Sequence, residues 1–154
     1  MLLTPHILVG ALIGFKIQNP WLVFILAIIS HFALDAIPHR EYDIKALKRK
    51  KIDKQFIIEF SQVLTDLVIG VSTTIFFVWH SPSRNYAILG MIAAVIPDGI
   101  TFLYWRTKLS IFKKITDFHR FTVHPKNNKN TPLIWGLGGQ LIVVALTIGA
   151  IIFR

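Results

Sequence analysis

The residues best suited to chemistry in this 154-residue chain are a few histidines and carboxylates that interrupt long apolar stretches. His31 and Asp35 are four positions apart, so they share one face of a helix, and Asp35 and His39 do so too if the helix continues past Pro38. An ionisable side chain within a membrane span costs about 2.5 to 3.5 kcal/mol on insertion scales, and such groups usually face the bundle interior and serve a function. The groups that fit this description are His6, His31, Asp35, His39, Glu59, Asp66 and Asp98.

These side chains offer nitrogen and oxygen ligands, and the chain contains no cysteine. Imidazole combined with carboxylate suits zinc, manganese or iron, and the carboxylates are numerous enough for one or two ions. A bound metal would offset the repulsion among Asp35, Asp66 and Asp98. Structural roles remain open, because a buried His31–Asp35 ion pair would have the same sequence and Glu59 can extend toward the neighbouring basic loop.

The elements that must position these groups are helices that cross a bilayer. Hydrophobic residues make up 53% of the chain and charged residues only 16%, which is unlike a soluble globular domain. The apolar stretches long enough to span a membrane are 21–38, 56–79, 86–105 and 133–153. A shorter stretch at 2–17 is either a tilted span or a re-entrant helix, and we favour a span. We therefore predict a single all-α domain over residues 1–154, a polytopic transmembrane bundle of five spans.

The first apolar stretch carries signals for a helix start and for close packing. Thr4 is suited to the N-cap position, and Pro5 to the first helical position, where its missing N–H costs nothing. Gly10 and Gly14 have the small-xxx-small spacing that lets another helix approach the backbone. Both features predict that this segment is a packed helix.

The orientation of the bundle follows from its basic residues. Of 17 lysines and arginines, seven lie within 40–54 and seven within 106–129. Because short cytoplasmic loops carry the Lys/Arg excess, both segments are predicted to be cytoplasmic, with the N-terminus inside and the C-terminus outside. We expect these segments to contact anionic lipid headgroups, and we expect no nucleic-acid binding because its signatures are absent. The polar groups then share one layer toward the cytoplasmic side of a multi-pass protein of the cell membrane.

Three short motifs have a recognisable pattern. They are Thr4-Pro5-His6 with the following GALIG, SHFALDAIPH at 30–39, and AAVIPDG at 93–99. Together they resemble small bacterial membrane-bound metal-dependent hydrolases, a family akin to zinc-dependent phospholipase C. The resemblance implies hydrolysis of an ester or phosphoester, with lipids among the candidate substrates. It also implies a metal, zinc first, with ligands at His6, His31, Asp35 and Asp98.

The chain also departs from that family pattern. The Pro-Asp motif follows the His-x-x-x-Asp motif here, whereas the family usually has the opposite order. HRFTVH at 119–124 approximates a further family motif, with one extra position between its threonine and its second histidine. His119 and His124 therefore either close the site from a loop or lie on the surface.

The leading hypothesis is a membrane metal-dependent hydrolase acting at the cytoplasmic leaflet. Asp66 or Glu59 would complete the metal shell or act as the general base. Two other classes remain open: an ion- or proton-coupled transporter, and a structural membrane subunit whose polar residues join helices by hydrogen bonds.

Overall fold

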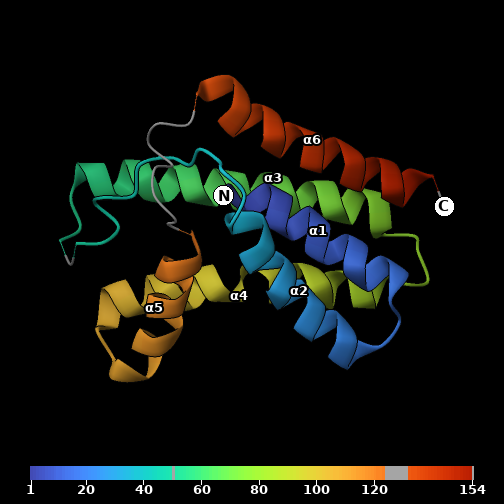
Figure 1. The fold of residues 1–154 in the computed structure, drawn as a ribbon, viewed down its shortest axis with the longest axis horizontal. Coiled ribbons are helices and arrows are strands. Elements are labelled where there is room, and N and C mark those ends of the chain that lie inside the picture. The colour runs from blue at the N-terminus through green and yellow to red at the C-terminus, as the bar shows by residue number, and fades with distance from the viewer. Residues whose placement is uncertain (50, 124–131, 154) are drawn as a thin grey trace.

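The computed structural model describes residues 1–49, 51–123 and 132–153, and within them it is all-α. The described residues form six helices, and Figure 1 shows how they are arranged. Their bounds are α1 (Leu3–Lys16), α2 (Pro20–Asp35), α3 (Lys54–Val78), α4 (Arg84–Thr107), α5 (Ser110–Val123) and α6 (Leu133–Ile152). Each of the five predicted apolar stretches forms a helix, and α5 is an additional one.

Three of the helices are long and apolar enough to cross a membrane, namely α3, α4 and α6. The apolar helices α1 and α2 have 14 and 16 residues. At about 1.5 Å per residue they are roughly 21 and 24 Å long, less than the roughly 30 Å of a hydrocarbon core. The structure thus provides three candidate spans and two shorter apolar helices, and five spans remain a prediction.

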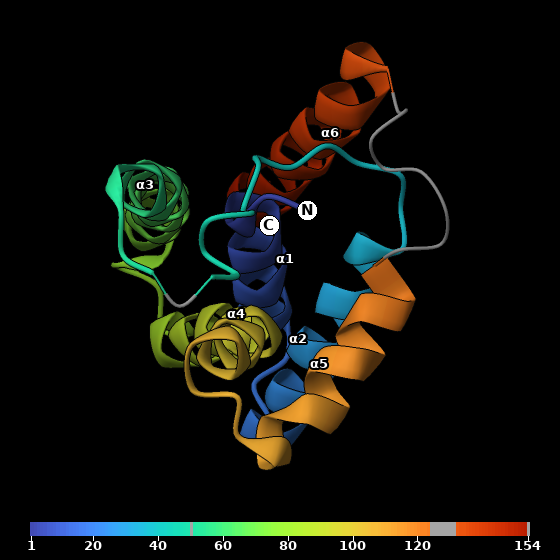
Figure 2. The ribbon, with the colours of Figure 1, turned by 90° about the vertical axis from the view of Figure 1, so that its left-hand side faces the viewer.

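The short helix α1 lies at the centre of the bundle (Figure 2) and packs against α2, α3, α4 and α6. Its closest neighbour is α4, because glycines bring the two backbones together. A methyl group added at Gly10 would overlap the carbonyl oxygen of Gly90, and one added at Gly14 would overlap that of Tyr86. This contact confirms the close approach predicted from the glycine spacing.

The start of α1 differs from the prediction. The helix begins at Leu3, and the expected N-cap Thr4 lies inside its first turn. Its free N–H groups are capped by another helix, because the carboxylate of Asp66 in α3 accepts hydrogen bonds from the amides of Leu3 and Thr4. Since Asp66 lies in the middle of α3, α1 starts halfway along the bundle. The free amides of a buried helix start required a partner, and the bundle provided it from a distant part of the chain.

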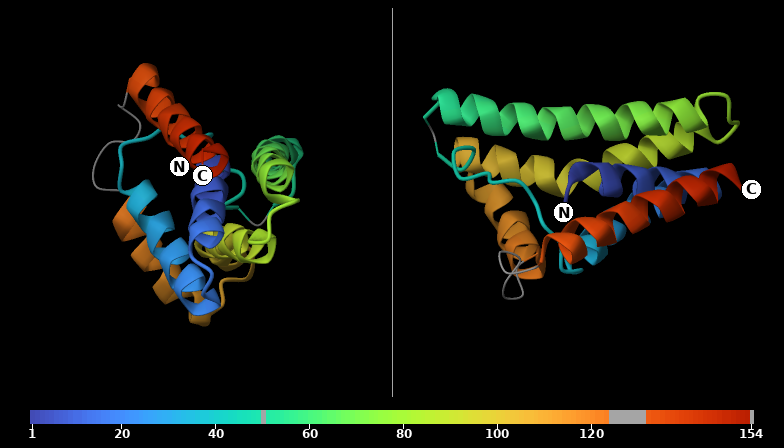
Figure 3. Two further views of the ribbon diagram at one scale, coloured as in Figure 1. Left: turned by 90° about the vertical axis from the view of Figure 1, so that its right-hand side faces the viewer. Right: turned by 90° about the horizontal axis from the view of Figure 1, so that it is seen from above.

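The basic segment 106–129, expected to be a loop, contains the helix α5. Figure 3 shows α5 turned away from the direction of the long helices, beside the end of α4. Its exposed apolar side chains include Ile111, Ile115 and Phe118, spaced three and four positions apart as on one helix face. The interspersed lysines keep the hydropathy of this segment below that of a membrane span. Its length of apolar sequence therefore does not reveal that it forms an amphipathic helix.

Helix α4 runs without interruption from Arg84 through Pro97 to Thr107. Asp98 is therefore presented from a continuous helix. Helix α2, in contrast, stops at Asp35 and does not continue past Pro38. His39 consequently lies beyond the helix and does not extend the His31–Asp35 face.

Candidate metal centre

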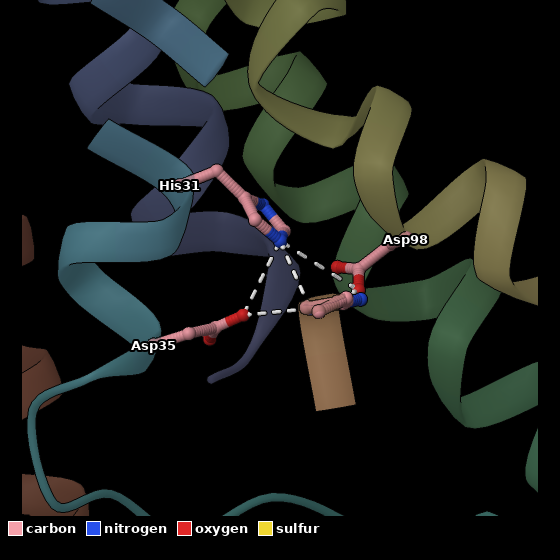
Figure 4. A group of neighbouring side chains, drawn as sticks. His31, Asp35 and Asp98 are labelled. Carbon is pink, nitrogen blue, oxygen red and sulfur yellow. Dashed lines mark hydrogen bonds and ion pairs between the residues drawn. The ribbon is translucent and has the colours of Figure 1, made fainter. Parts of the chain in front are cut away.

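Four side chains from three helices converge where α2, α4 and α5 meet. His31 and Asp35 come from the last turns of α2, Asp98 from α4 and His119 from α5. One ligand atom from each lies within 4.8 Å of all the others. Figure 4 shows His31, Asp35 and Asp98 pointing toward one another. We call these four residues the His/Asp group.

The distances within the His/Asp group are those of a compact site. The Nε2 atoms of His31 and His119 are 3.2 Å apart. The Oδ2 atom of Asp35 lies 3.0 Å from Nε2 of His119 and 3.2 Å from Nε2 of His31. Asp98 lies further out, with Oδ1 3.6 Å from the His119 nitrogen and 3.9 Å from the His31 nitrogen. The side chain of Asp98 is 33% exposed while that of Asp35 is 2% exposed, so the site opens on the Asp98 side.

Both imidazoles are fixed through their second nitrogen. Nδ1 of His31 lies 2.8 Å from the carbonyl oxygen of Ala94, and Nδ1 of His119 lies 3.0 Å from the hydroxyl of Thr101. A carbonyl only accepts hydrogen bonds, so Nδ1 of His31 carries the proton and Nε2 of the neutral ring presents its lone pair to the group. This outer hydrogen bond is the usual arrangement of histidines that bind a metal.

The electrostatics of the His/Asp group call for a positive charge at its centre. Two carboxylates and two imidazole nitrogens face one another in a largely buried space. The carboxylates and Nε2 of neutral His31 are acceptors, and Nε2 of neutral His119 is one too when its Nδ1 donates to Thr101. A divalent ion with nitrogen and oxygen ligands satisfies all four, and two histidines with two carboxylates match a four-coordinate zinc shell. Protonated imidazoles paired with Asp35 are the other solution.

His6, expected to be a ligand, lies beside the His/Asp group and is not a member of it. Its Nε2 atom is 3.1 Å from Oδ1 of Asp35, the oxygen that faces away from His119. Its ring stacks on that of His31 with centroids 4.3 Å apart. The Met1 ammonium contacts the same Asp35 oxygen at 2.6 Å. His6 therefore positions the side chains of two candidate ligands.

Asp66, a proposed base or ligand, is occupied in holding α1. Besides the two backbone amides, its carboxylate accepts hydrogen bonds from the hydroxyl of Thr4 at 2.6 Å and from that of Tyr42 at 3.2 Å. Burial, together with the charge of Asp66, raises the pKa of the Tyr42 phenol, so this hydroxyl stays protonated and donates. Four neutral donors thus satisfy Asp66, and it lies outside the His/Asp group.

Glu59, the other proposed base, is buried and holds the connection between α2 and α3. Its Oε2 atom accepts hydrogen bonds from the amides of Ala46 at 2.7 Å and Leu47 at 3.0 Å, and the side chain of Gln55 donates to Oε1 at 3.2 Å. Glu59 therefore caps a turn of the chain and neither extends to the surface nor reaches the His/Asp group.

The remaining histidines fall into separate environments. His39 is buried, with Nδ1 2.7 Å from the carbonyl of Ile37 and Nε2 4.0 Å from Glu41. His119, expected either to close the site from a loop or to lie on the surface, belongs to the site and comes from the helix α5. The sequence signal for this helix is the spacing of Ile111, Ile115 and Phe118, which are three and four positions apart. His124 lies outside the described residues.

Comparisons of the chain with protein-family models, with curated proteins and with solved structures gave no match. The chemistry of the His/Asp group and the apolar character of the helices are therefore what point to a function.

Proposed function

We propose that this chain is a multi-pass protein of the cell membrane that uses one divalent metal ion to hydrolyse an ester or phosphoester at the cytoplasmic leaflet. The observation that carries the proposal is the His/Asp group, whose ligand atoms lie within 4.8 Å of one another. The apolar helices α3, α4 and α6 support the membrane setting. The basic segments 40–54 and 106–129 support an orientation with this end of the bundle in the cytoplasm.

The donor set favours zinc, with manganese and iron as the next candidates. Imidazole and carboxylate ligands without a thiolate form a mixed nitrogen and oxygen shell, in which catalytic zinc takes three protein ligands and keeps a fourth position for water. Among the described residues there is one such group, which supports one ion. The sequence had left one or two ions open.

Each residue of the site has a task in the proposed reaction. His31 and His119 are held by Ala94 and Thr101 so that their Nε2 atoms face inward. A bound divalent ion would supply an acidified water and polarise the scissile bond. Asp98 lies further out than the other three and at the open side. We therefore assign the metal to His31, Asp35 and His119, which leaves a fourth position for water, and give Asp98 the proton-accepting role that the sequence gave to Asp66 or Glu59. Substrate would approach on that side, because Asp35 is closed in by His6 and α1.

The proposal is tested by metal content and hydrolysis together. Protein purified without chelator should contain about one zinc per chain, and a lipid phosphodiester probe in mixed micelles should be cleaved. His119→Ala should reduce both, with metal affinity falling by about 100-fold or more. His80→Ala is the matched control, because His80 is exposed at the end of α3 and outside the His/Asp group.

A structural ion-pair network is the second candidate, and one observation favours it. Asp35 already contacts the Met1 ammonium and His6 in addition to His31 and His119. This candidate predicts that wild-type protein takes up no metal from excess zinc, and that His119→Ala lowers only the thermal stability. Such a result would overturn the hydrolase proposal.

A further inference from the structure

An apolar groove lies on the surface beside the His/Asp group, where α2, α4 and α5 meet. It has a volume of about 310 Å³. Its lining is formed by Ile28, Phe32, Ile96, Pro97, Ile100, Lys114, Ile115 and Phe118. Seven of these eight side chains are apolar, and the eighth is a lysine, so the groove suits a hydrocarbon segment that carries an anionic group.

The groove and the His/Asp group share their walls. On each of the three helices a lining residue directly precedes or follows a member of the group, as Phe32 follows His31, Pro97 precedes Asp98 and Phe118 precedes His119. The rings of Phe32 and Phe118 are 5.0 Å apart, and the ring of Phe32 is 5.7 Å from that of His119. The groove therefore adjoins the site along all three helices.

The surroundings of the groove indicate where such a ligand would come from. Ile111 and Phe121, on the same helix as three lining residues, are 75% and 81% exposed, so α5 presents further apolar surface beside the groove. Apolar surface of this kind is stable when it faces lipid. Lys114 lies on the same helix and attracts anionic headgroups at the membrane surface.

We propose that this groove binds the acyl chain of a membrane lipid with an anionic phosphate headgroup and places that headgroup at the His/Asp group. The inference rests on the proposed hydrolase function and names its substrate class. The chain enters from the bilayer along α5, its hydrocarbon lies against Ile28, Ile100 and Phe118, and its phosphate reaches the open side at Asp98. Pro97 and Phe32 separate the hydrocarbon from the polar centre.

Photolabelling of the full chain in lipid nanodiscs tests the proposal. The discs contain phosphatidylcholine and a small fraction of phosphatidic acid with a diazirine in its acyl chain, and labelled peptides are mapped by mass spectrometry. We expect labels to concentrate on α2, α4 and α5 around the groove. Ile100→Trp, which fills the groove, should reduce them by about tenfold. Ile92→Trp is the matched control, because Ile92 is exposed on the same helix and does not line the groove.

The headgroup requirement is tested with a second probe. Diacylglycerol with the same photoreactive chain should label the groove less than phosphatidic acid, and Lys114→Gln should reduce that difference. Lys113→Gln is the control, since Lys113 pairs with Asp117 and does not line the groove.

Measuring the zinc content of the same samples distinguishes failure of the groove proposal from failure of the hydrolase proposal. Equal labelling of the exposed faces of α3 and α6, unchanged by Ile100→Trp, would show bulk lipid only and overturn the groove proposal, even with zinc bound. Labelling that Ile100→Trp abolishes in a protein that binds no zinc would support the groove and overturn the hydrolase. We expect Ile100→Trp to lose the labelling of the groove and to keep the zinc content of the wild type.

Discussion

Asp35 and Asp66 are both carboxylates within apolar helices of the same bundle, and their surroundings differ in kind. Neutral donors surround Asp66: two backbone amides and two hydroxyls, each with a proton to give. Asp35 faces imidazole nitrogens on both of its oxygens, and one of those imidazoles already uses its neutral-form proton on Ala94. Asp66 is complete as a structural cap with neutral donors, whereas Asp35 pairs with the Met1 ammonium on one oxygen and with titratable imidazoles on both.

The comparison shows that depth in a membrane helix does not by itself identify a functional carboxylate. Asp66 interrupts an apolar stretch as Asp35 does, and the sequence therefore makes it a candidate for the metal shell or the general base. Its role is nevertheless to hold the start of α1, which would otherwise leave free amides in the interior. The kind of partner separates the two cases: neutral amides and hydroxyls surround Asp66, whereas titratable nitrogens surround Asp35.

Exchanging each carboxylate for its amide should give opposite results, and this is the largest effect we predict. Asp35→Asn removes a negative ligand from the His/Asp group, so zinc affinity should fall by about 100-fold or more. Asp66→Asn should keep the zinc content of the wild type. It should lower the free energy of unfolding by about 3 kcal/mol, because the amide NH2 would replace one of the two acceptor oxygens and face the N–H group of either Leu3 or Thr4. Elemental analysis and unfolding in mixed micelles measure the two quantities.

Asp117→Asn serves as the control for both variants, because Asp117 is exposed and its pair with Lys113 is a surface contact. We expect neither zinc content nor stability to change in it. Loss of zinc in Asp66→Asn at temperatures where that variant is folded would contradict the separation of the two carboxylates.

A smaller effect is predicted for the hydroxyl that holds His119. Thr101→Val keeps the shape of the side chain and removes the partner of Nδ1. Zinc affinity should therefore decrease by about tenfold, at the lower end of what such outer contacts contribute. Thr74→Val is the matched control, since Thr74 is buried and its hydroxyl has no partner in the described structure. Equal zinc affinities in the two variants would show that the orientation of His119 does not depend on Thr101.

The smallest effect concerns pH and His39, in the connection between α2 and α3. Burial lowers the pKa of His39 below the ordinary value, so the folded protein favours the neutral ring. The unfolded chain binds the proton more readily, and stability present above about pH 6.5 is lost as the pH falls. With metal removed from both proteins, the melting temperature of the wild type should fall about 2 to 4 °C more than that of His39→Gln between pH 7.5 and 5.5. Parallel melting curves would refute this assignment.

Much of the secondary structure could be predicted because apolar length and helix formation are local properties. The stretches 56–79 and 133–153 match α3 and α6 to within two residues at each end. The spacing of His31 and Asp35 placed them on one helix face, and both belong to the His/Asp group. The amphipathic α5 was missed because only long apolar runs were counted as helices.

The sequence by itself determined that the chain forms apolar helices and that histidines and carboxylates interrupt them. Tertiary structure alone decided which of these groups meet. His119 comes from a separate amphipathic helix, His6 contacts the outer oxygen of Asp35, and Asp66 and Glu59 are used by backbone amides. The physical reason is that a buried polar group takes whichever partner the packing brings within hydrogen-bond distance, and packing joins positions far apart in the chain.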